Sequence, residues 1–290
     1  MSQQRSPDDG KNTFPQAASK WATPNGAIWI NRSPCHHLND AARSIEAVAM
    51  TSAQPADRLA LAYIFERQWL HLLLLLMLLG GLGPAVRADA FRVGALFGLA
   101  TPVWMALAVI LAITHQGYVW FCWRMELHAS LLTRCFGDRA FPLYASGFAI
   151  LVLSRLTTVV VLAAANRNTV PLDVSALRIL AVVTAVPVVY LFYSVQRYFT
   201  FRRALGLDHF DSSYRSRPLV NQGIFRFTRN GMYVFGLLIA WLPGLWYASA
   251  AGLLLALFNH AYVWVHYVAT ERPDMKRIYP GLAGTPPPAA

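Results

Sequence analysis

The chain alternates between long apolar stretches and shorter polar connections. Four long stretches come first, at residues 69–86, 93–113, 143–165 and 177–198. Each is near the ~20 residues that a helix needs to cross the hydrocarbon core of a bilayer. The pattern therefore predicts four membrane-spanning helices. The second could extend through residues 118–123, whose aromatic side chains are typical of a membrane interface.

Two further apolar stretches, residues 232–242 and 246–269, follow a long polar loop, and Pro243-Gly244 separates them. The first is too short to cross a bilayer without help from its flanks. We expect the pair to form a helical hairpin that crosses the membrane fully or in part. The predicted fold is thus an all-α, multi-pass transmembrane helix bundle of about 5–6 spans with a C-terminal helical hairpin.

The composition also indicates a membrane protein. Hydrophobic residues make up 56% of the chain and charged residues 13%, whereas soluble domains carry about 25% charged residues. The formal net charge of +11 comes mainly from Arg, which suits loops that face anionic lipid headgroups. No nucleic-acid-binding motif accompanies these residues, so we expect a membrane as partner and no nucleic acid. The three cysteines lack metal-ligand spacing, and we predict no metal site.

The two ends of the chain differ from its middle. Residues 1–57 are polar, without the features of a signal peptide, and we predict that they are disordered. Met50 opens a segment that looks like an ordinary bacterial start, so residues 1–49 could instead come from an over-extended reading frame. We assign residues 58–200 to the first helices, residues 201–280 to the functional region, and residues 281–290 to a disordered tail.

The distribution of basic residues predicts the orientation in the membrane. Seven Arg lie between residues 197 and 229, which places this loop on the cytoplasmic side. Alternation of the spans puts residues 124–139, both termini and the end of the last helix on the same side. Without the N-terminal region, the loops and the tail assigned to the inside then carry 13 basic residues against 4 outside. We therefore expect a cell (inner) membrane protein with cytoplasmic N- and C-termini.

Arg155 lies near the middle of the third predicted span. An Arg at that depth costs at least ~2.5 kcal/mol on insertion scales, so it usually faces the bundle interior or a wet cavity. One interpretation is that Arg155 contacts a substrate phosphate or a cofactor carboxylate. The other is that it pairs with a backbone carbonyl or another helix, and the sequence does not decide between them.

The segment from Gly223 to Tyr233 is a basic turn that leads into an apolar helix. Backbone N–H groups at a helix N-terminus can hold an anion, and Gly231 would let a ligand approach the backbone. The alternative is a basic membrane anchor with a Gly turn. Asp208 and His209, in the preceding loop, are adjacent in sequence and are expected to belong to a solvated loop.

The last apolar helix ends on a carboxylate. His260, Trp264, Tyr267 and Glu271 are spaced so that they share one face of a regular helix. His266 would lie about 120° away from His260, given the helical period. The spacing therefore favours His260 over His266 as a partner of Glu271.

Two spaced motifs resemble a known family. They are Gly223-Ile224-Phe225 with Arg229-Asn230-Gly231-Met232-Tyr233, and Glu271-Arg272-Pro273 with Ile278-Tyr279. Together they resemble the phosphatidylethanolamine N-methyltransferase and isoprenylcysteine carboxyl methyltransferase superfamily of integral membrane methyltransferases. Gly231 replaces the usual Pro of that family, and Arg272 replaces the second Glu of a Glu-Glu pair. The resemblance covers roughly residues 200–280, and the Ile278-Tyr279 ending leans to the phospholipid branch.

The resemblance implies an S-adenosylmethionine-dependent enzyme with a cytoplasmic cofactor pocket. It implies cofactor-binding roles for Arg229, Asn230, Gly231, Tyr233 and Glu271, and the aromatic Trp264 and Tyr267 would join Tyr233 around the sulfonium. Glu271 or His260 would take a proton from an amine acceptor. Arg155 or Arg226 would hold a lipid phosphate.

The function expected from this resemblance is N-methylation of a lipid amine of the phosphatidylethanolamine type. Carboxyl or thiol methylation of an isoprenylcysteine-like lipophilic acceptor is the close alternative. An NADPH-dependent membrane sterol-type reductase is a third, although its usual tail motifs are missing. A non-catalytic membrane relative is the fourth, because Gly231 and Arg272 depart from the family pattern.

Overall fold

A computed structural model describes residues 55–280, with side chains from residue 60 onward except that of Arg215. The polar N-terminal extension, apart from its last three residues, and the tail from residue 281 lie outside the described residues. The first described helix begins at Pro55, three residues before the predicted start of helical structure. Pro suits a first helical position because that residue needs no N–H.

The described chain is almost entirely helical, which confirms the predicted fold class. The elements up to the fourth long helix are α2 (Pro55–Ile64), α3 (Gln68–Ala85), a 3₁₀ turn (Asp89–Phe91), β1 (Ala95–Leu96), β2 (Leu99–Ala100), α4 (Thr101–Ala129), α5 (Leu131–Phe136), a 3₁₀ turn (Gly137–Arg139), α6 (Ala140–Ala165) and α7 (Val174–Ser194). The elements that follow are a π-turn (Val195–Phe199), α8 (Phe201–Ala204), 3₁₀ turns at Leu207–His209, Ser212–Ser216 and Gly223–Arg226, α9 (Gly231–Val234), a 3₁₀ turn (Gly236–Ala240), α10 (Trp241–Trp246), α11 (Ala250–His266), a π-turn (Tyr267–Glu271) and α12 (Arg272–Ile278). β1 and β2 have two residues each and form an antiparallel hairpin that pairs Ala95 with Ala100.

Five helical segments of residues 55–280 are long and apolar enough to cross a membrane. They are Ala60–Ala85, Thr101–Ala129, Leu131–Ala165, Val174–Phe199 and Ala250–Ile278. The first arm of the C-terminal hairpin, Gly231–Trp246, is apolar but shorter. The multi-pass prediction is therefore confirmed, with five spans and a hairpin whose first arm is too short to cross by itself.

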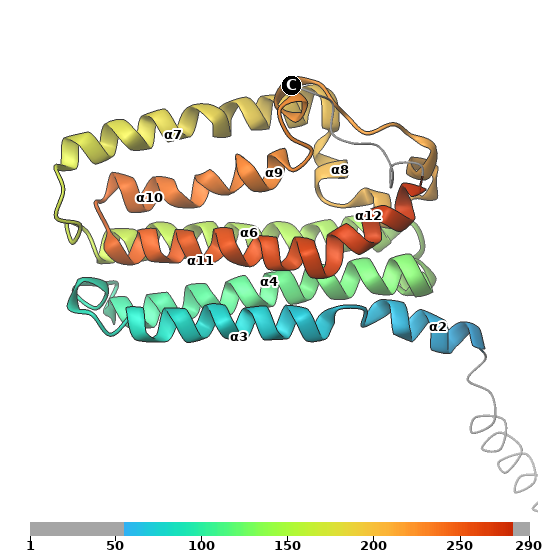
Figure 1. Cartoon of the computed structure of the whole chain (residues 1–290), viewed down its shortest axis with the longest axis horizontal. Helices are drawn as coiled ribbons and strands as arrows, with labels where there is room; N and C mark the ends of the chain where they lie inside the picture. Colours follow the sequence, from blue (N-terminus) through green and yellow to red (C-terminus); the bar gives the residue numbers. More distant parts are fainter. Residues whose placement is uncertain (1–54, 281–290) are drawn as a thin grey trace, which may run out of the picture. The chain divides into compact units, whose positions relative to one another are not determined.

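The helices form a bundle with the hairpin arm inserted between its parts (Figure 1). Helices α3, α4, α6 and α11 run side by side, and α9 and α10 lie between this group and α7. The largest buried apolar cluster belongs to the four-helix group and includes Met105, Ala112, Leu162 and Leu255. Helix α7 instead leaves a row of large apolar side chains exposed, Ile179, Val182, Val183, Val186 and Val189. Such a row suits contact with lipid, because lipid-facing surfaces need no polar cover.

The second span begins later than predicted. Helix α4 starts at Thr101, because the six residues before it, 95–100, form the small β-hairpin. Gly94, just before the hairpin, and Gly98, in its turn, have φ 99° and φ 75°. Such positive φ values favour glycine, and Pro102 then suits the first turn of the helix. The helix continues to Ala129, so the aromatic stretch at residues 118–123 lies within it, as the sequence suggested.

The break in the C-terminal hairpin also differs from the prediction. Pro243 and Gly244 lie inside α10, and the chain reverses at residues 247–249. Pro243 is tolerated there because the first residues of a helix donate no intrahelical hydrogen bond. Ser249 caps α11 by accepting a hydrogen bond from the Gly252 N–H at 3.0 Å. A Cβ on Gly244 would lie 2.8 Å from the Leu253 nitrogen, so this glycine allows the two arms to approach each other.

Replacing Gly94 by Ala should destabilise the protein by about 2–3 kcal/mol, since positive φ and steric overlap both disfavour a side chain. A Cβ at this position would lie 1.9 Å from the Ala165 carbonyl oxygen. Gly98→Ala is a matched control, because Gly98 also has positive φ but has no atom within 4 Å of the added Cβ. We expect Gly98→Ala to cost about 1 kcal/mol. Denaturant unfolding of the purified variants measures the free energy of unfolding of each. Equal decreases in the two variants would contradict the assigned contact with Ala165.

Candidate functional site

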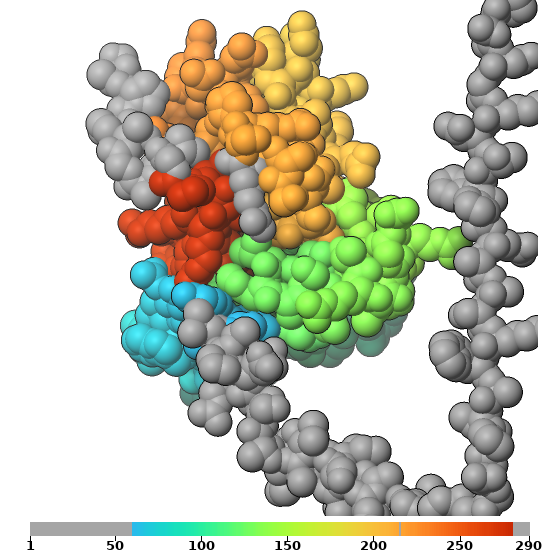
Figure 2. Space-filling model, turned by 90° about the vertical axis from the view of Figure 1, so that its right-hand side faces the viewer, coloured from blue at the N-terminus to red at the C-terminus, as the bar shows by residue number. Residues whose placement is uncertain are grey.

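A cavity of about 790 Å³ lies inside the described part of the bundle. Its volume is in the range of small-molecule and cofactor sites. One part is lined by polar side chains, namely Arg203, Asp208, Arg229, Glu271, Arg272, Lys276 and Tyr279. These residues come from the end of the bundle at which α8 and α12 lie, which faces the viewer in Figure 2. A second part is lined mainly by apolar side chains, among them Leu156, Val159, Leu191, Phe192, Val195, Leu237 and Val263.

Glu271 lines this cavity, and its Oε2 atom is buried without a hydrogen-bond partner. The residue closes a π-turn in which the Arg272 N–H donates to the Tyr267 carbonyl. The hydrogen bonds of such a turn join residues five positions apart, so the regular helical period does not hold across residues 267–271. His266 lines the same cavity and is 1% exposed, and neither of its ring nitrogens has a hydrogen-bond partner. The cavity is therefore lined by a carboxylate and an imidazole that both have unused hydrogen-bonding capacity.

His260 lies elsewhere. Its Nδ1 atom accepts a hydrogen bond from the Trp241 Nε1–H at 3.3 Å, and it is not among the residues that line the cavity. A regular helix would have put His260 on the face of Glu271, but the π-turn shifts that face. Of the two histidines, His266 and not His260 thus lines the cavity that Glu271 also lines.

Three aromatic residues predicted to surround a cofactor do contact one another. The ring centroids of Tyr233 and Trp264 are 5.8 Å apart, those of Tyr233 and Tyr267 are 5.7 Å apart, and those of Trp264 and Tyr267 are 5.5 Å apart. Tyr233 and Tyr267 line the cavity, whereas Trp264 does not. Trp264 therefore supports the two tyrosine rings from behind.

The basic turn before α9 contributes two of its predicted residues to the cavity, Arg229 and Asn230. The turn is held against α7, because the Ile224 N–H donates to the Ser194 Oγ at 3.0 Å. Gly231 is buried and does not line the cavity, and a Cβ on it would lie 3.3 Å from the Phe225 ring. Its small size serves packing within the turn.

Arg226 is exposed and lies outside the cavity lining. Its guanidinium carbon is 4.6 Å from the centroid of the neighbouring Phe227 ring. Arg155, the other residue predicted to hold a substrate, does line the cavity. It also has partners on other helices, His115 at 2.7 Å and Asn259. Arg155 therefore pairs with other helices, as one interpretation held, and also lines a cavity that a ligand could occupy, as the other required.

Asp208 and His209 are buried, which contradicts the prediction of a solvated loop. Asp208 pairs with Arg203 at 3.3 Å and accepts a hydrogen bond from the Tyr279 hydroxyl. The His209 ring stacks on Trp123 with 4.2 Å between centroids. Gly206 makes this packing possible, since its φ is 85° and a Cβ there would lie 2.5 Å from the Trp123 ring.

Residues 176–281 match a family model described as phospholipid methyltransferase. The matched segment is a phospholipid methyltransferase domain. It contains α7, the basic turn, the hairpin and α12, so the resemblance seen at residues 200–280 is confirmed and extends to α7. No curated protein and no solved structure matches the chain.

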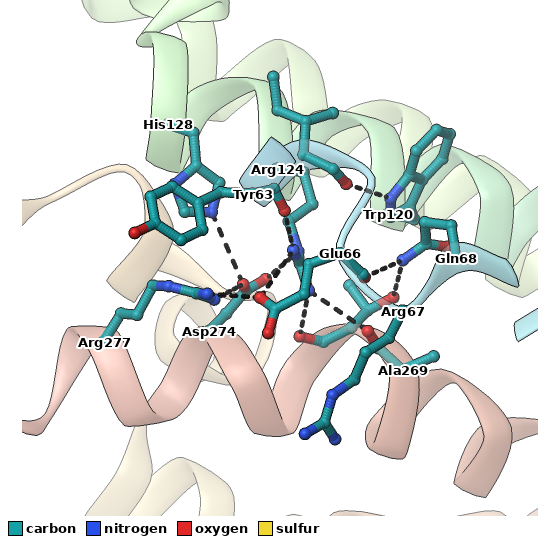
Figure 3. Close-up of polar contacts among 12 residues, drawn as sticks. Tyr63, Glu66, Arg67, Gln68, Trp120, Arg124, His128, Ala269, Asp274 and Arg277 are labelled. Carbon is teal, nitrogen blue, oxygen red and sulfur yellow. Dashed lines mark hydrogen bonds and ion pairs between the residues drawn. The ribbon is translucent and has the colours of Figure 1, made fainter. Parts of the chain in front are cut away.

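The last helix of the phospholipid methyltransferase domain is fixed by buried charges (Figure 3). Asp274 and Arg124 are both 0% exposed, and the Arg124 Nε atom lies 2.9 Å from the Asp274 Oδ2 atom. Arg277 forms a further ion pair with Glu66 of the segment between α2 and α3. Arg124 was expected in a cytoplasmic loop, but it lies inside α4 and also donates to the Tyr63 carbonyl. These contacts attach α12 to elements that precede the domain.

Tyr279→Phe should lower the free energy of unfolding by about 1–2 kcal/mol at neutral pH, because Asp208 and Arg203 lose a buried partner. The Tyr279 hydroxyl donates to Asp208 and accepts from Arg203 at 2.7 Å. Burial and the hydrogen bond to Asp208 raise the pKa of Tyr279 far above its usual range.

The folded protein therefore keeps the Tyr279 proton at a pH at which the unfolded chain loses it, so stability should fall as the pH rises above about 10. Unfolding curves at several pH values should show a shallower decline for Tyr279→Phe than for the unmodified protein. Tyr193→Phe, at an exposed tyrosine of α7, is the control. It should change neither the free energy of unfolding at neutral pH nor its decline at high pH. An unchanged pH slope in Tyr279→Phe would contradict the assignment.

Proposed function

We propose that the protein is an integral membrane methyltransferase that uses S-adenosylmethionine to methylate a lipid amine of the phosphatidylethanolamine type. The observation that carries the proposal is the unpartnered Glu271 carboxylate in a cavity that Tyr233 and Tyr267 also line. Both the carboxylate and the tyrosines belong to the phospholipid methyltransferase domain.

The residues present fit this cofactor. When bound, S-adenosylmethionine supplies a methyl group on a positively charged sulfur, which an amine nitrogen can take in a single displacement. Glu271 offers a buried carboxyl oxygen that no protein group engages, and a cationic cofactor can pair with it. The faces of Tyr233 and Tyr267 add cation–π attraction, and the cations at the polar end, including Arg272 and Lys276, can hold the carboxylate of the cofactor.

An amine acceptor must give up a proton during transfer, and the cavity wall holds two groups that can take it. Glu271 is one, as the resemblance implies. For the second, His266 is better placed than His260, because His266 lines the cavity and neither of its nitrogens is engaged. We therefore propose Glu271 and His266 as the proton acceptors, either directly or through water.

The apolar part of the cavity suits the hydrocarbon of a lipid acceptor. Of the two arginines expected to hold its phosphate, Arg155 lines the cavity and Arg226 does not. Carboxyl methylation of a lipophilic acid is the second candidate, favoured by the four cations at the polar end, Arg203, Arg229, Arg272 and Lys276. We further propose that this end and both termini face the cytoplasm of a cell (inner) membrane, since the Arg-rich segment from residue 197 to residue 229 lies there.

Binding of S-adenosylhomocysteine and NADPH to the purified protein tests the proposal. Titration calorimetry should detect S-adenosylhomocysteine and not NADPH. Binding of NADPH alone would indicate a reductase, and binding of neither would indicate a non-catalytic relative. Lipid analysis of cells with and without the gene should then show methylated phosphatidylethanolamine only with the gene, whereas methylated lipophilic acids would favour the second candidate.

A further inference from the structure

Three polar side chains from three spans meet in the membrane-embedded part of the cavity. His115 belongs to α4, Arg155 to α6 and Asn259 to α11, and all three line the cavity. Arg155 donates to the His115 Nδ1 atom at 2.7 Å and to the Asn259 Oδ1 atom. We call these three residues the donor pole. His115 and Arg155 precede the segment that matches the phospholipid methyltransferase family.

The hydrogen bonds within the donor pole leave donors facing the cavity. A guanidinium has no acceptor, so the His115 Nδ1 atom must accept and the ring proton must be on Nε2. The Nε2 atom is buried without a partner, although His115 is 5% exposed and lines the cavity. The Asn259 Oδ1 atom accepts from Arg155, and its amide nitrogen donates to the Leu255 carbonyl at 3.1 Å. The capacity that remains is the His115 Nε2–H and the other N–H groups of Arg155.

The donor pole also lacks a negative charge. None of the ion pairs among the described residues includes Arg155. A cation within a membrane span is costly unless a partner or water compensates it. A ligand that carries an anionic oxygen would supply both the missing charge and the acceptor for the His115 Nε2–H.

We propose that the donor pole binds the phosphate of the phospholipid whose amine is methylated, an inference that rests on the proposed function. The position favours the lipid over the cofactor. Asn259 precedes Glu271 by twelve residues on the same helical segment, about 18 Å along its axis at ~1.5 Å per residue. The cations suited to a water-soluble cofactor lie at the polar end, whereas the apolar lining adjoins the pole.

The chain places the reacting groups in a consistent order. His266 follows Asn259 by seven residues, about 10 Å along the helix axis. Two carbons and an ester oxygen join the amine nitrogen of ethanolamine to its phosphorus. A phosphate on Arg155 therefore leaves the amine on the His266 side of the donor pole, with Glu271 farther along the same helical segment. The donor pole thus fixes the distance from the lipid phosphate to the site of transfer.

Arg155→Gln tests the proposal in the full-length protein. We expect its affinity for dioctanoyl phosphatidylethanolamine to fall by about tenfold or more, the loss typical of a hydrogen-bonded charge pair. Native mass spectrometry of the detergent-solubilised protein measures this affinity, and calorimetry measures that for S-adenosylhomocysteine, which should not change. Arg178→Gln is the matched control, because Arg178 contacts only the Trp246 carbonyl and ring among the described residues, and it should change neither affinity.

Asn259→Asp is a second variant that keeps Arg155 in place. The new carboxylate would occupy the guanidinium and cancel its charge, so lipid affinity should again fall while cofactor affinity stays unchanged. Lipid affinity unchanged in both variants would overturn the proposal. A loss of S-adenosylhomocysteine affinity alone would also overturn it, because the pole would then hold the cofactor carboxylate. If the unmodified protein bound no S-adenosylhomocysteine but bound the lipid in an Arg155-dependent way, the proposed function would fail and the phosphate site would stand.

Discussion

Replacing Glu271 by Ala is expected to weaken cofactor binding and slow methyl transfer strongly while the protein stays inserted and folded. The lost carboxyl group lines the cavity with a buried, unpartnered oxygen, which we propose contacts the cationic cofactor. Removal of a charged hydrogen-bond partner weakens binding by about 10- to 100-fold, and loss of an acid–base group slows transfer by a further ~100-fold or more. Calorimetry with S-adenosylhomocysteine and transfer of a labelled methyl group to lipid measure the two effects.

The stability of the Glu271→Ala variant should be unchanged or higher. The Oε2 atom has no hydrogen-bond partner in the protein, and an unpartnered buried carboxylate costs free energy in the folded state. Glu126→Ala is the control for which we expect the opposite result. Glu126 is buried and accepts hydrogen bonds from the Thr133 N–H at 3.0 Å and from the Thr133 hydroxyl. It should lower stability and leave cofactor affinity intact. Unchanged cofactor affinity in Glu271→Ala would remove Glu271 from the site.

The membrane spans could be predicted because hydropathy is a local property. The predicted ends of the first, third and fourth spans lie close to those of α3, α6 and α7. The start of α4 was missed because an apolar stretch can form a strand as well as a helix. Only the backbone shows that Gly94 and Gly98 turn residues 95–100 into a hairpin.

The site was predicted in part. The sequence resemblance placed Arg229, Tyr233 and Glu271 together, and they do line one cavity. The choice between His260 and His266 depended on a regular helical period. The π-turn at residues 267–271 changes that period by one residue, and no residue type in the segment indicates it.

The buried charges could not be predicted because their partners are distant in sequence. Arg124 and Asp274 belong to different helices, and each resembles a loop charge when only its neighbours are considered. The same holds for Asp208, which pairs with Arg203 nearby but also binds Tyr279 beyond α12. A polar segment between two apolar ones predicts a connection, but it does not predict whether that connection folds back into the bundle.

Asp274→Ala should destabilise the protein by about 3–5 kcal/mol, the cost of breaking a buried ion pair from one side. The substitution would leave the Arg124 guanidinium fully buried, with Glu66 at 3.8 Å as its remaining carboxylate. The backbone carbonyls of Tyr63, Ala269 and Thr270 also stay in contact with it, which limits the loss to the lower part of that range. His209, with its Nε2 atom 3.6 Å from Asp274, would lose its carboxylate as well.

Chemical denaturation in detergent measures this loss, and two further variants identify its origin. Arg277→Ala removes a partner that is 30% exposed and should cost only about 0–1 kcal/mol. The double variant Arg124→Met with Asp274→Leu replaces the buried pair by apolar groups of similar size and should recover part of the stability, because the carbonyls that Arg124 contacted lose their donor. An Asp274→Ala loss no larger than that of Arg277→Ala would show that the buried pair does not hold α12.

The same variants separate a structural role from a binding role. Arg272, Met275 and Lys276 line the cavity and belong to α12 together with Asp274. Loosening α12 therefore moves part of the cavity wall, so Asp274→Ala should lower cofactor affinity and stability together. The apolar double variant should restore part of the stability and part of the cofactor affinity, because Asp274 does not line the cavity itself. Glu271 differs, because we propose that its own side chain contacts the cofactor, so Glu271→Ala should lower cofactor affinity without lowering stability.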